Sequence, residues 1–204
     1  MFTNNDGPEE EGQEEEAHIM GPTGEKEHPL MGLVGDITEA AAQALHMSLL
    51  SYNGGKILAA KEDLEDTVDI EFFISSGGGG VNDMFAVYDL MRIVKTNRDI
   101  ATFGYGRVYS AAVLLLAAGT PGKRYMAKNT RMMIHHCSSN VGGSHPEIRT
   151  NFDELKKVED MMVEALAENS ALSVGELYNI MSRNTDEYFS AADALEMGIV
   201  DKII

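Results

Sequence analysis

Ser110 and His135 are two side chains that could together support nucleophilic catalysis. Ser110 stands where the strand-like run IATFGY has ended and the very apolar, helix-like run SAAVLLLAAG begins. A hydroxyl there could merely cap the helix. It could also act as a nucleophile at the positive end of the helix dipole, where backbone N–H groups stabilise a developing oxyanion. The position of Ser110 alone leaves both interpretations open.

A serine nucleophile needs a base, and His135 in RMMIHHC lies on a predicted strand that could run close to Ser110. The neighbouring His136 and Cys137 suggest two alternatives. A metal site is disfavoured, because only His135 and Cys137 could share a face of a strand and no second, spaced ligand pair exists. A Cys137 nucleophile is disfavoured, because no helix N-terminus would lower the pKa of its thiol. We therefore expect no metal ligands.

Four consecutive glycines, in the stretch ISSGGGGVND at Ile74–Asp83, separate an apolar strand-like run from a helix-like run. A phosphate cradle would need a following Lys-Ser or Lys-Thr, which is absent. Backbone N–H groups can point into a groove only where no side chain blocks the approach, and glycine alone allows this together with positive φ. This stretch is therefore a second candidate wall of the site.

The surrounding elements indicate an α/β fold. Strand–turn–helix patterns occur three times, at residues 30–51, 68–97 and 99–119. In the first, Asp36 and Glu39 predict a capping box at the start of the helix. Such repeats with buried strands are typical of parallel sheets. A long amphipathic helix is predicted from His145, with Pro146 near its start, and two short helices follow, the second ending at Gly198.

Composition favours one domain in a reducing compartment. The 204 residues are 44% hydrophobic, and Cys137 is the single cysteine, which excludes an internal disulfide. The net charge is −17, and residues 1–28 hold nine acidic residues and one lysine. We expect this acidic segment to be a disordered tail, with a processed propeptide or a gate over a pore as alternatives. Neither a nucleic-acid partner nor a membrane span is expected, and we predict a cytoplasmic protein.

The segment GRVYSAAVLLLAAGTPGKRYMAKNTRMMIH, from Gly106 to His135, resembles the nucleophile-to-base segment of the ClpP family of serine peptidases, GxxxSMAxxLLxAGxxGKRxxxPNxxxMIHQ. The match runs without a gap over thirty residues. The resemblance implies that Ser110 is the nucleophile and His135 the general base. The family's orienting acid corresponds to Asp186 in TDEYFSAADALEMGIVD. It would fix the imidazole tautomer and stabilise the imidazolium.

The glycine stretch also resembles the family, whose pattern INSPGGxxxxGMxIYDxM aligns without gaps on Ile74–Met91. The resemblance implies that the backbone N–H of Gly79 holds the oxyanion, with the N–H of Ala111 as second donor. Gly78 and Gly80 would belong to the substrate groove. The likeness extends from about Leu30 to the end of the chain.

Several positions differ from the family pattern, and none removes a triad member. They concern the substrate groove, the surroundings of the triad, and a pair that bridges stacked rings in the family. The differences are Gly77 for Pro, Gly80 for an aliphatic residue, Tyr109 for a small residue, His136–Cys137 for Gln-Pro, and Asn184–Thr185 for an acidic residue followed by Arg.

The resemblance implies a crotonase-like α/β spiral of ClpP type over residues 29–204, with a protruding handle at about 138–168. It further implies heptameric rings, stacked as a tetradecamer, that cleave unfolded polypeptides delivered by a Clp-type AAA+ unfoldase. We expect no cofactor, since the chain lacks GxxxxGK[ST] and only the unfoldase would use ATP. The alternatives are a non-catalytic subunit of a mixed ring and, less favoured, a crotonase-fold acyl-CoA enzyme.

Overall fold

Strands and helices alternate along most of the chain. The structure is a computed structural model that describes residues 29–58, 68–138, 142–183 and 185–204. The predicted tail, residues 1–28, and Asn184 lie outside the described residues. The strands are β1 (Leu30–Val34), β2 (Ile70–Ser76), β3 (Ile100–Tyr109), β4 (Arg124–Met126), β5 (Arg131–Ile134), β6 (Glu187–Phe189) and β7 (Lys202–Ile203). The helices are α1 (Glu39–Tyr52), α2 (Val81–Val94), α3 (Ala111–Ala117), α4 (His145–Glu168), α5 (Val174–Met181) and α6 (Ala191–Glu196).

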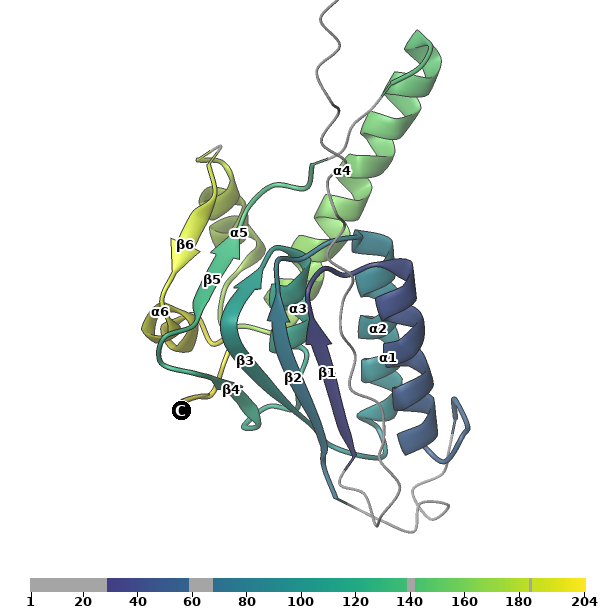
Figure 1. Cartoon of the computed structure of the whole chain (residues 1–204). Helices are drawn as coiled ribbons and strands as arrows, with labels where there is room; N and C mark the ends of the chain where they lie inside the picture. The colour runs from purple at the N-terminus through teal and green to yellow at the C-terminus, as the bar shows by residue number, and fades with distance from the viewer. Residues whose placement is uncertain (1–28, 59–67, 139–141, 184) are drawn as a thin grey trace, which may run out of the picture.

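The described strands form one sheet, in the order β1-β2-β3-β4-β7, and β5 and β6 continue from β3 beside this path. All pairings are parallel except that of β5 with β6. Helices α1 and α2 lie side by side on one side of the sheet, and α3 packs against β3 (Figure 1). The strand β2 buries every second residue, Ile70, Phe72 and Ile74, in the shared core. The predicted α/β fold with a parallel sheet is confirmed.

The strand β3 pairs with two different strands along one edge. Its residues 102–104 pair with β4, and its residues 107–109 pair with β5. Between these two halves lies Gly106, whose φ is 66°. The carboxyl ends of β3 and β5 therefore lie next to each other, at the end of the sheet from which α4 projects (Figure 1).

The helix α1 begins later than predicted. Its N-cap is Thr38, whose side chain accepts a hydrogen bond from the first turn. Ile37 instead forms a parallel β-bridge with Gly79. Because this bridge holds the chain extended at Ile37, a helix cannot begin at Asp36, and the predicted capping box of Asp36 and Glu39 is wrong.

The glycine turn between β2 and α2 is closely packed at two positions. Gly78 and Gly79 have φ angles of 98° and 144°, which residues with a side chain rarely adopt. A Cβ on Gly79 would lie 2.3 Å from the carbonyl oxygen of Ile37. A Cβ on Gly78 would lie 2.7 Å from the Cβ of Ser110. The turn is therefore held between the segment before α1 and the start of α3.

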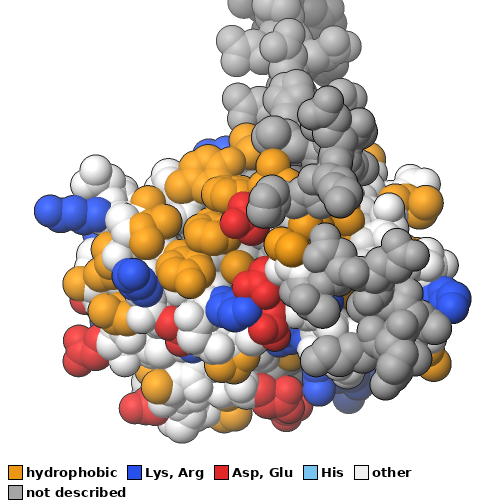
Figure 2. Space-filling model, turned by 90° about the horizontal axis from the view of Figure 1, so that it is seen from below, with side chains coloured by type: hydrophobic (Ala, Val, Ile, Leu, Met, Phe, Trp, Pro, Cys, Tyr) orange, Lys and Arg blue, Asp and Glu red, His pale blue; other side chains and the backbone are white. Residues whose placement is uncertain are grey.

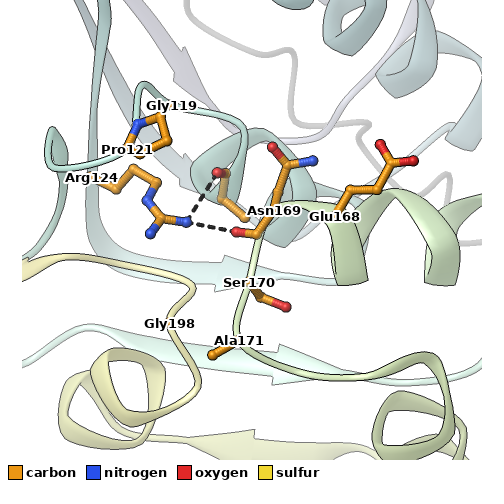
Figure 3. Close-up of a pocket in the computed structure, with 9 residues that line it drawn as sticks. Gly119, Pro121, Arg124, Glu168, Asn169, Ser170, Ala171 and Gly198 are labelled. Carbon is orange, nitrogen blue, oxygen red and sulfur yellow. Dashed lines mark hydrogen bonds between the residues drawn. The ribbon is translucent and has the colours of Figure 1, made fainter.

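Arg124 connects the root of α4 to the sheet. Its Nη2 donates to Asp201 Oδ1 at 2.6 Å, and this contact holds the pKa of Asp201 below its usual value. Its Nη1 donates to the carbonyl oxygens of Asn169 at 2.6 Å and Ala117 at 3.5 Å (Figure 3). Both oxygens lie at helix C-termini, where carbonyl groups lack partners within the helix. One side chain thus joins β4, α3, α4 and the segment before β7.

Helix α4, which forms most of the predicted handle, projects away from the sheet (Figure 1). A capping box of Ser144 and Glu147 starts the helix. In its first half, Ile148 and Phe152 are 43% and 61% exposed. Its buried residues all lie near its C-terminal end: Met162, Val163, Ala165 and Leu166.

The face opposite the projecting helix is shown in Figure 2. Hydrophobic, basic and acidic side chains lie side by side on its described part. The Lys and Arg side chains visible there do not form the continuous stripe that would track a phosphate backbone.

We predict that Gly79→Ala destabilises the fold by about 2–4 kcal/mol, because the new Cβ would meet the backbone of Ile37 and φ is positive. The matched control is Gly175→Ala in α5, where a Cβ would meet nothing within 4 Å. It should leave stability unchanged or slightly raised. Thermal unfolding at equal protein concentrations measures both, and equal melting temperatures for the two variants would contradict the packing described for Gly79.

Candidate active site

Ser110 and His135 are in direct contact. The Ser110 hydroxyl lies 2.8 Å from His135 Nε2, a hydrogen bond in which the serine can donate to the imidazole. Ser110 is the N-cap residue of α3, yet its side chain makes no capping hydrogen bond. The Ser110 hydroxyl therefore bonds to the histidine and does not cap the helix, a geometry that suits a nucleophile.

The backbone of Ser110 is strained. Its φ is 55° and its ψ −127°, and among the described residues it is the only one besides glycine with positive φ. Such conformations persist only where the surrounding structure holds them. Here the Ser110 N–H donates to Met133 O at 2.8 Å, and Gly78 packs against the Ser110 side chain. The elbow between β3 and α3 therefore turns the hydroxyl toward β5.

The register of β3 and β5 explains why the pair meets. Tyr109, the last residue of β3, is paired with Met133 of β5. Ser110 comes one residue after this pair and His135 two residues after it, so both follow the same end of the sheet. The strand β5 ends at Ile134, one residue before the histidine. The prediction that His135 itself lies on this strand is therefore wrong, although the histidine follows the strand directly.

Asp186 completes a line of three side chains. Its Oδ1 lies 3.5 Å from His135 Nδ1, on the side of the ring opposite Ser110. Strand β6 brings it there, because β6 runs antiparallel to β5 and pairs Glu187 with Ile134. The side chains of His135 and Asp186 are 29% and 51% exposed, so the acid end of the line is open to solvent in the single chain.

Tyr188 is a neighbour of this line that the sequence analysis did not identify. Its hydroxyl lies 3.4 Å from Asp186 Oδ2. Its ring packs edge to face against Tyr109, with centroids 5.7 Å apart. Both tyrosines are in register with Met133, one on each side of β5. The spacing of two residues between Asp186 and Tyr188, which places both on one face of a strand, was the available signal.

The predicted oxyanion donors are free to act. Within the glycine turn, the Gly78 N–H donates to Ser76 Oγ at 3.1 Å, and the Gly80 N–H donates to Ile37 O at 2.8 Å. The N–H groups of Gly79 and Ala111 have no acceptor among the residues that the structure describes. Of the two predicted groove residues, Gly78 lies against Ser110, whereas Gly80 is the N-cap of α2.

Cys137 is unsuited to nucleophilic attack. Burial, together with the nearby Glu159 carboxylate, raises the pKa of its thiol to about 11. The thiol is therefore protonated near neutral pH, and a thiol is a far weaker nucleophile than a thiolate. Within the described ranges, no three His, Cys, Asp or Glu side chains gather as metal ligands.

Two further observations bound the site. The pocket drawn in Figure 3, at the root of α4, includes none of the predicted site residues, and the bonds of its Arg124 serve the fold. Among the described helices, none combines the length and the apolar character that crossing a bilayer requires.

Comparison with known proteins identifies the family. The sequence model of the Clp protease family matches residues 33–204. ATP-dependent Clp protease proteolytic subunit 2 of Bifidobacterium longum is 33% identical over 148 residues, 72% of this chain and 69% of that protein. The protein of the same name from Thermobifida fusca is 36% identical over 151 residues, 74% of this chain and 71% of that protein. The protein of that name from Streptomyces coelicolor is 36% identical over 148 residues, 72% of this chain and 66% of that protein. The predicted resemblance is confirmed, and the chain belongs to the Clp protease family.

Proposed function

We propose that Ser110, His135 and Asp186 form the catalytic triad with which this ClpP-like serine peptidase subunit cleaves peptide bonds of unfolded polypeptides. The observation that carries the proposal is the 2.8 Å contact between Ser110 Oγ and His135 Nε2, made from a strained backbone elbow. A hydroxyl that only capped its helix would bond to the helix N–H groups instead.

The geometry supports acyl transfer in two halves. His135 Nε2 takes the hydroxyl proton as Ser110 Oγ attacks the carbonyl carbon, and the imidazolium then gives that proton to the leaving amine. An ester between Ser110 and the N-terminal part of the substrate remains. Water attacks this ester as His135 takes its proton, and the imidazolium returns that proton to Ser110 Oγ as the bond between Oγ and the acyl carbon breaks. The second product then leaves as a carboxylic acid. The Asp186 carboxylate, 3.5 Å from His135 Nδ1, favours the tautomer with the proton on Nδ1, so that Nε2 faces the serine, and its charge stabilises the imidazolium.

The tetrahedral intermediate needs donors for its oxyanion. The N–H groups of Gly79 and Ala111 suit this role, because neither has an acceptor within the described structure. Ala111 directly follows Ser110, and Gly79 directly follows Gly78, which lies against Ser110. Gly78 leaves the approach open, since a side chain there would strike Ser110. A preorganised donor of this kind contributes roughly 3 kcal/mol to lowering the barrier.

We further propose that the chain works in a cytoplasmic complex of stacked heptameric rings with a Clp-type AAA+ unfoldase that alone uses ATP. The exposed apolar side chains of Ile148 and Phe152 on the projecting α4 support association, because an unpaired apolar stripe is stabilised by a partner surface. The chemistry of the triad itself calls for no cofactor. A non-catalytic ring subunit remains the second candidate, and intact Ser–His geometry disfavours it.

A fluorophosphonate probe tests the triad. It should label the assembled wild-type protein at Ser110, located by mass spectrometry, and should not label Ser110→Ala. The control is Ser173→Ala, at another helix start, where the hydroxyl bonds to Glu176. His135→Ala should lower peptide cleavage by at least about 10³-fold without dispersing the assembly. An unlabelled wild type would favour the non-catalytic subunit, and a label that persists in Ser110→Ala would move the nucleophile elsewhere.

The ring proposal has its own test. Negative-stain micrographs of the wild type should show sevenfold rings and, from the side, double rings. Phe152→Glu places a charge in the exposed apolar stripe of α4 and should leave single rings, whereas Glu154→Gln on the same helix should leave double rings. Particles without sevenfold symmetry would refute the proposed assembly.

The contact between Tyr188 and Asp186 predicts a modest catalytic effect. Tyr188→Phe keeps the ring against Tyr109 but removes the hydroxyl, so kcat for a short fluorogenic peptide should fall about threefold to fivefold at an unchanged KM. The control is Tyr105→Phe, at an exposed tyrosine of β3, which should change neither constant. Equal rates for both variants would remove the hydroxyl of Tyr188 from the catalytic arrangement.

A further inference from the structure

One carboxylate of the projecting helix binds the segment that directly follows His135. Glu159 Oε2 accepts the backbone N–H of Cys137 at 2.8 Å and lies 3.0 Å from His136 Nδ1. The Glu159 side chain is only 16% exposed. A carboxylate withdrawn from water to this extent is costly unless hydrogen bonds compensate, so the two donors account for its position.

Both donors come from positions at which this chain departs from the family pattern. Where the pattern has proline, position 137 would offer no backbone N–H, since the proline ring occupies that nitrogen. Where the pattern has glutamine, this chain has His136, whose Nδ1–H can donate in the neutral or the protonated form of the ring. In this chain His136 and Cys137 thus each place one donor on the same oxygen of Glu159, and the backbone donor of Cys137 is the one that the family's proline lacks.

Next to Glu159, helix α4 is hydrogen-bonded to helix α5. The adjacent Asp160 accepts a hydrogen bond from the hydroxyl of Tyr178 on α5. This carboxylate also raises the pKa of Tyr178 to about 12, so the phenol keeps its proton and the bond persists over the working pH range. Of these two neighbouring carboxylates of α4, Glu159 thus accepts hydrogen bonds from the segment after β5, and Asp160 accepts one from α5.

We propose that Glu159 is a positioning residue, which fixes the backbone after His135 to helix α4 and thereby holds the imidazole in line between Ser110 and Asp186. The inference rests on the proposed function of that triad. Strand β5 ends at Ile134, so no sheet hydrogen bonds hold His135 from its C-terminal side. The bond from Cys137 N–H to Glu159 is the next anchor along the chain. When a general base is slightly misaligned, the rate of the chemical step falls more than the affinity for the substrate does.

The test measures kcat and KM for a short fluorogenic peptide, and the rate of fluorophosphonate labelling, on the full assembled protein. Glu159→Ala should lower kcat and the labelling rate about tenfold with KM within twofold. Glu159→Gln keeps an acceptor without its charge and should lose about threefold, and it carries the test if the alanine variant folds poorly. Glu164→Ala, an exposed carboxylate on the same helix, is the control and should stay within twofold of the wild type.

A double-mutant cycle separates positioning from general support of the fold. In a His136→Ala, Cys137→Pro background both donors are gone, so Glu159→Ala should change kcat less than twofold there. The same tenfold loss in both backgrounds, a loss expressed in KM alone, or no loss in the wild-type background would each overturn the inference. If the labelled wild type is active, such a result leaves the proposed triad standing; a wild type that the probe does not label would overturn the triad and the inference with it.

Discussion

The divided edge of β3 is the constraint on which the site depends. If β4 alone paired along the whole strand, β5 could not lie beside the carboxyl end of β3, and Ser110 would not meet the histidine that follows β5. The N-terminal part of this edge of β3 pairs with β4, its C-terminal part pairs with β5, and Gly106 lies between the two parts. The backbone hydrogen bonds between the strands thereby set how far apart the Ser110 and His135 backbones lie, whatever rotamers their side chains adopt.

The strain at Ser110 follows from this arrangement. The chain must leave β3 and enter α3 within one residue, and a positive φ at a serine costs on the order of 1–3 kcal/mol. Three surrounding features offset that cost: the bond from Ser110 N–H to Met133 O, the deeply buried helix α3, and the close approach of Gly78. The last explains why glycine is needed at that position, since a methyl group would collide with the serine it supports.

The motif predicted the chemistry better than the connections around it. Ser110, His135 and the glycine turn could be placed from an ungapped segment, because their spacing is local to successive strand–turn–helix units. The start of α1 at Thr38 depends on a partner distant in sequence, Gly79, and the segment after β5 likewise binds a distant residue, Glu159. Tyr188 was missed for the same reason, since its ring partner, Tyr109, belongs to another strand. Local propensity does not contain these pairings.

The two unusual glycines of the turn, Gly77 and Gly80, lie beside acidic side chains. A Cβ on Gly77 would lie 3.1 Å from Asp36 Oδ1, and a Cβ on Gly80 would lie 2.3 Å from Asp83 Oδ2. Proline and an aliphatic residue, which the family pattern has at these positions, would need the space that the carboxylates occupy. Asp83 lies in the first turn of α2, where the helix dipole favours a negative charge. The extra glycines thus make room for charged groups beside the turn, while Gly78 and Gly79 keep the conformation that the site requires.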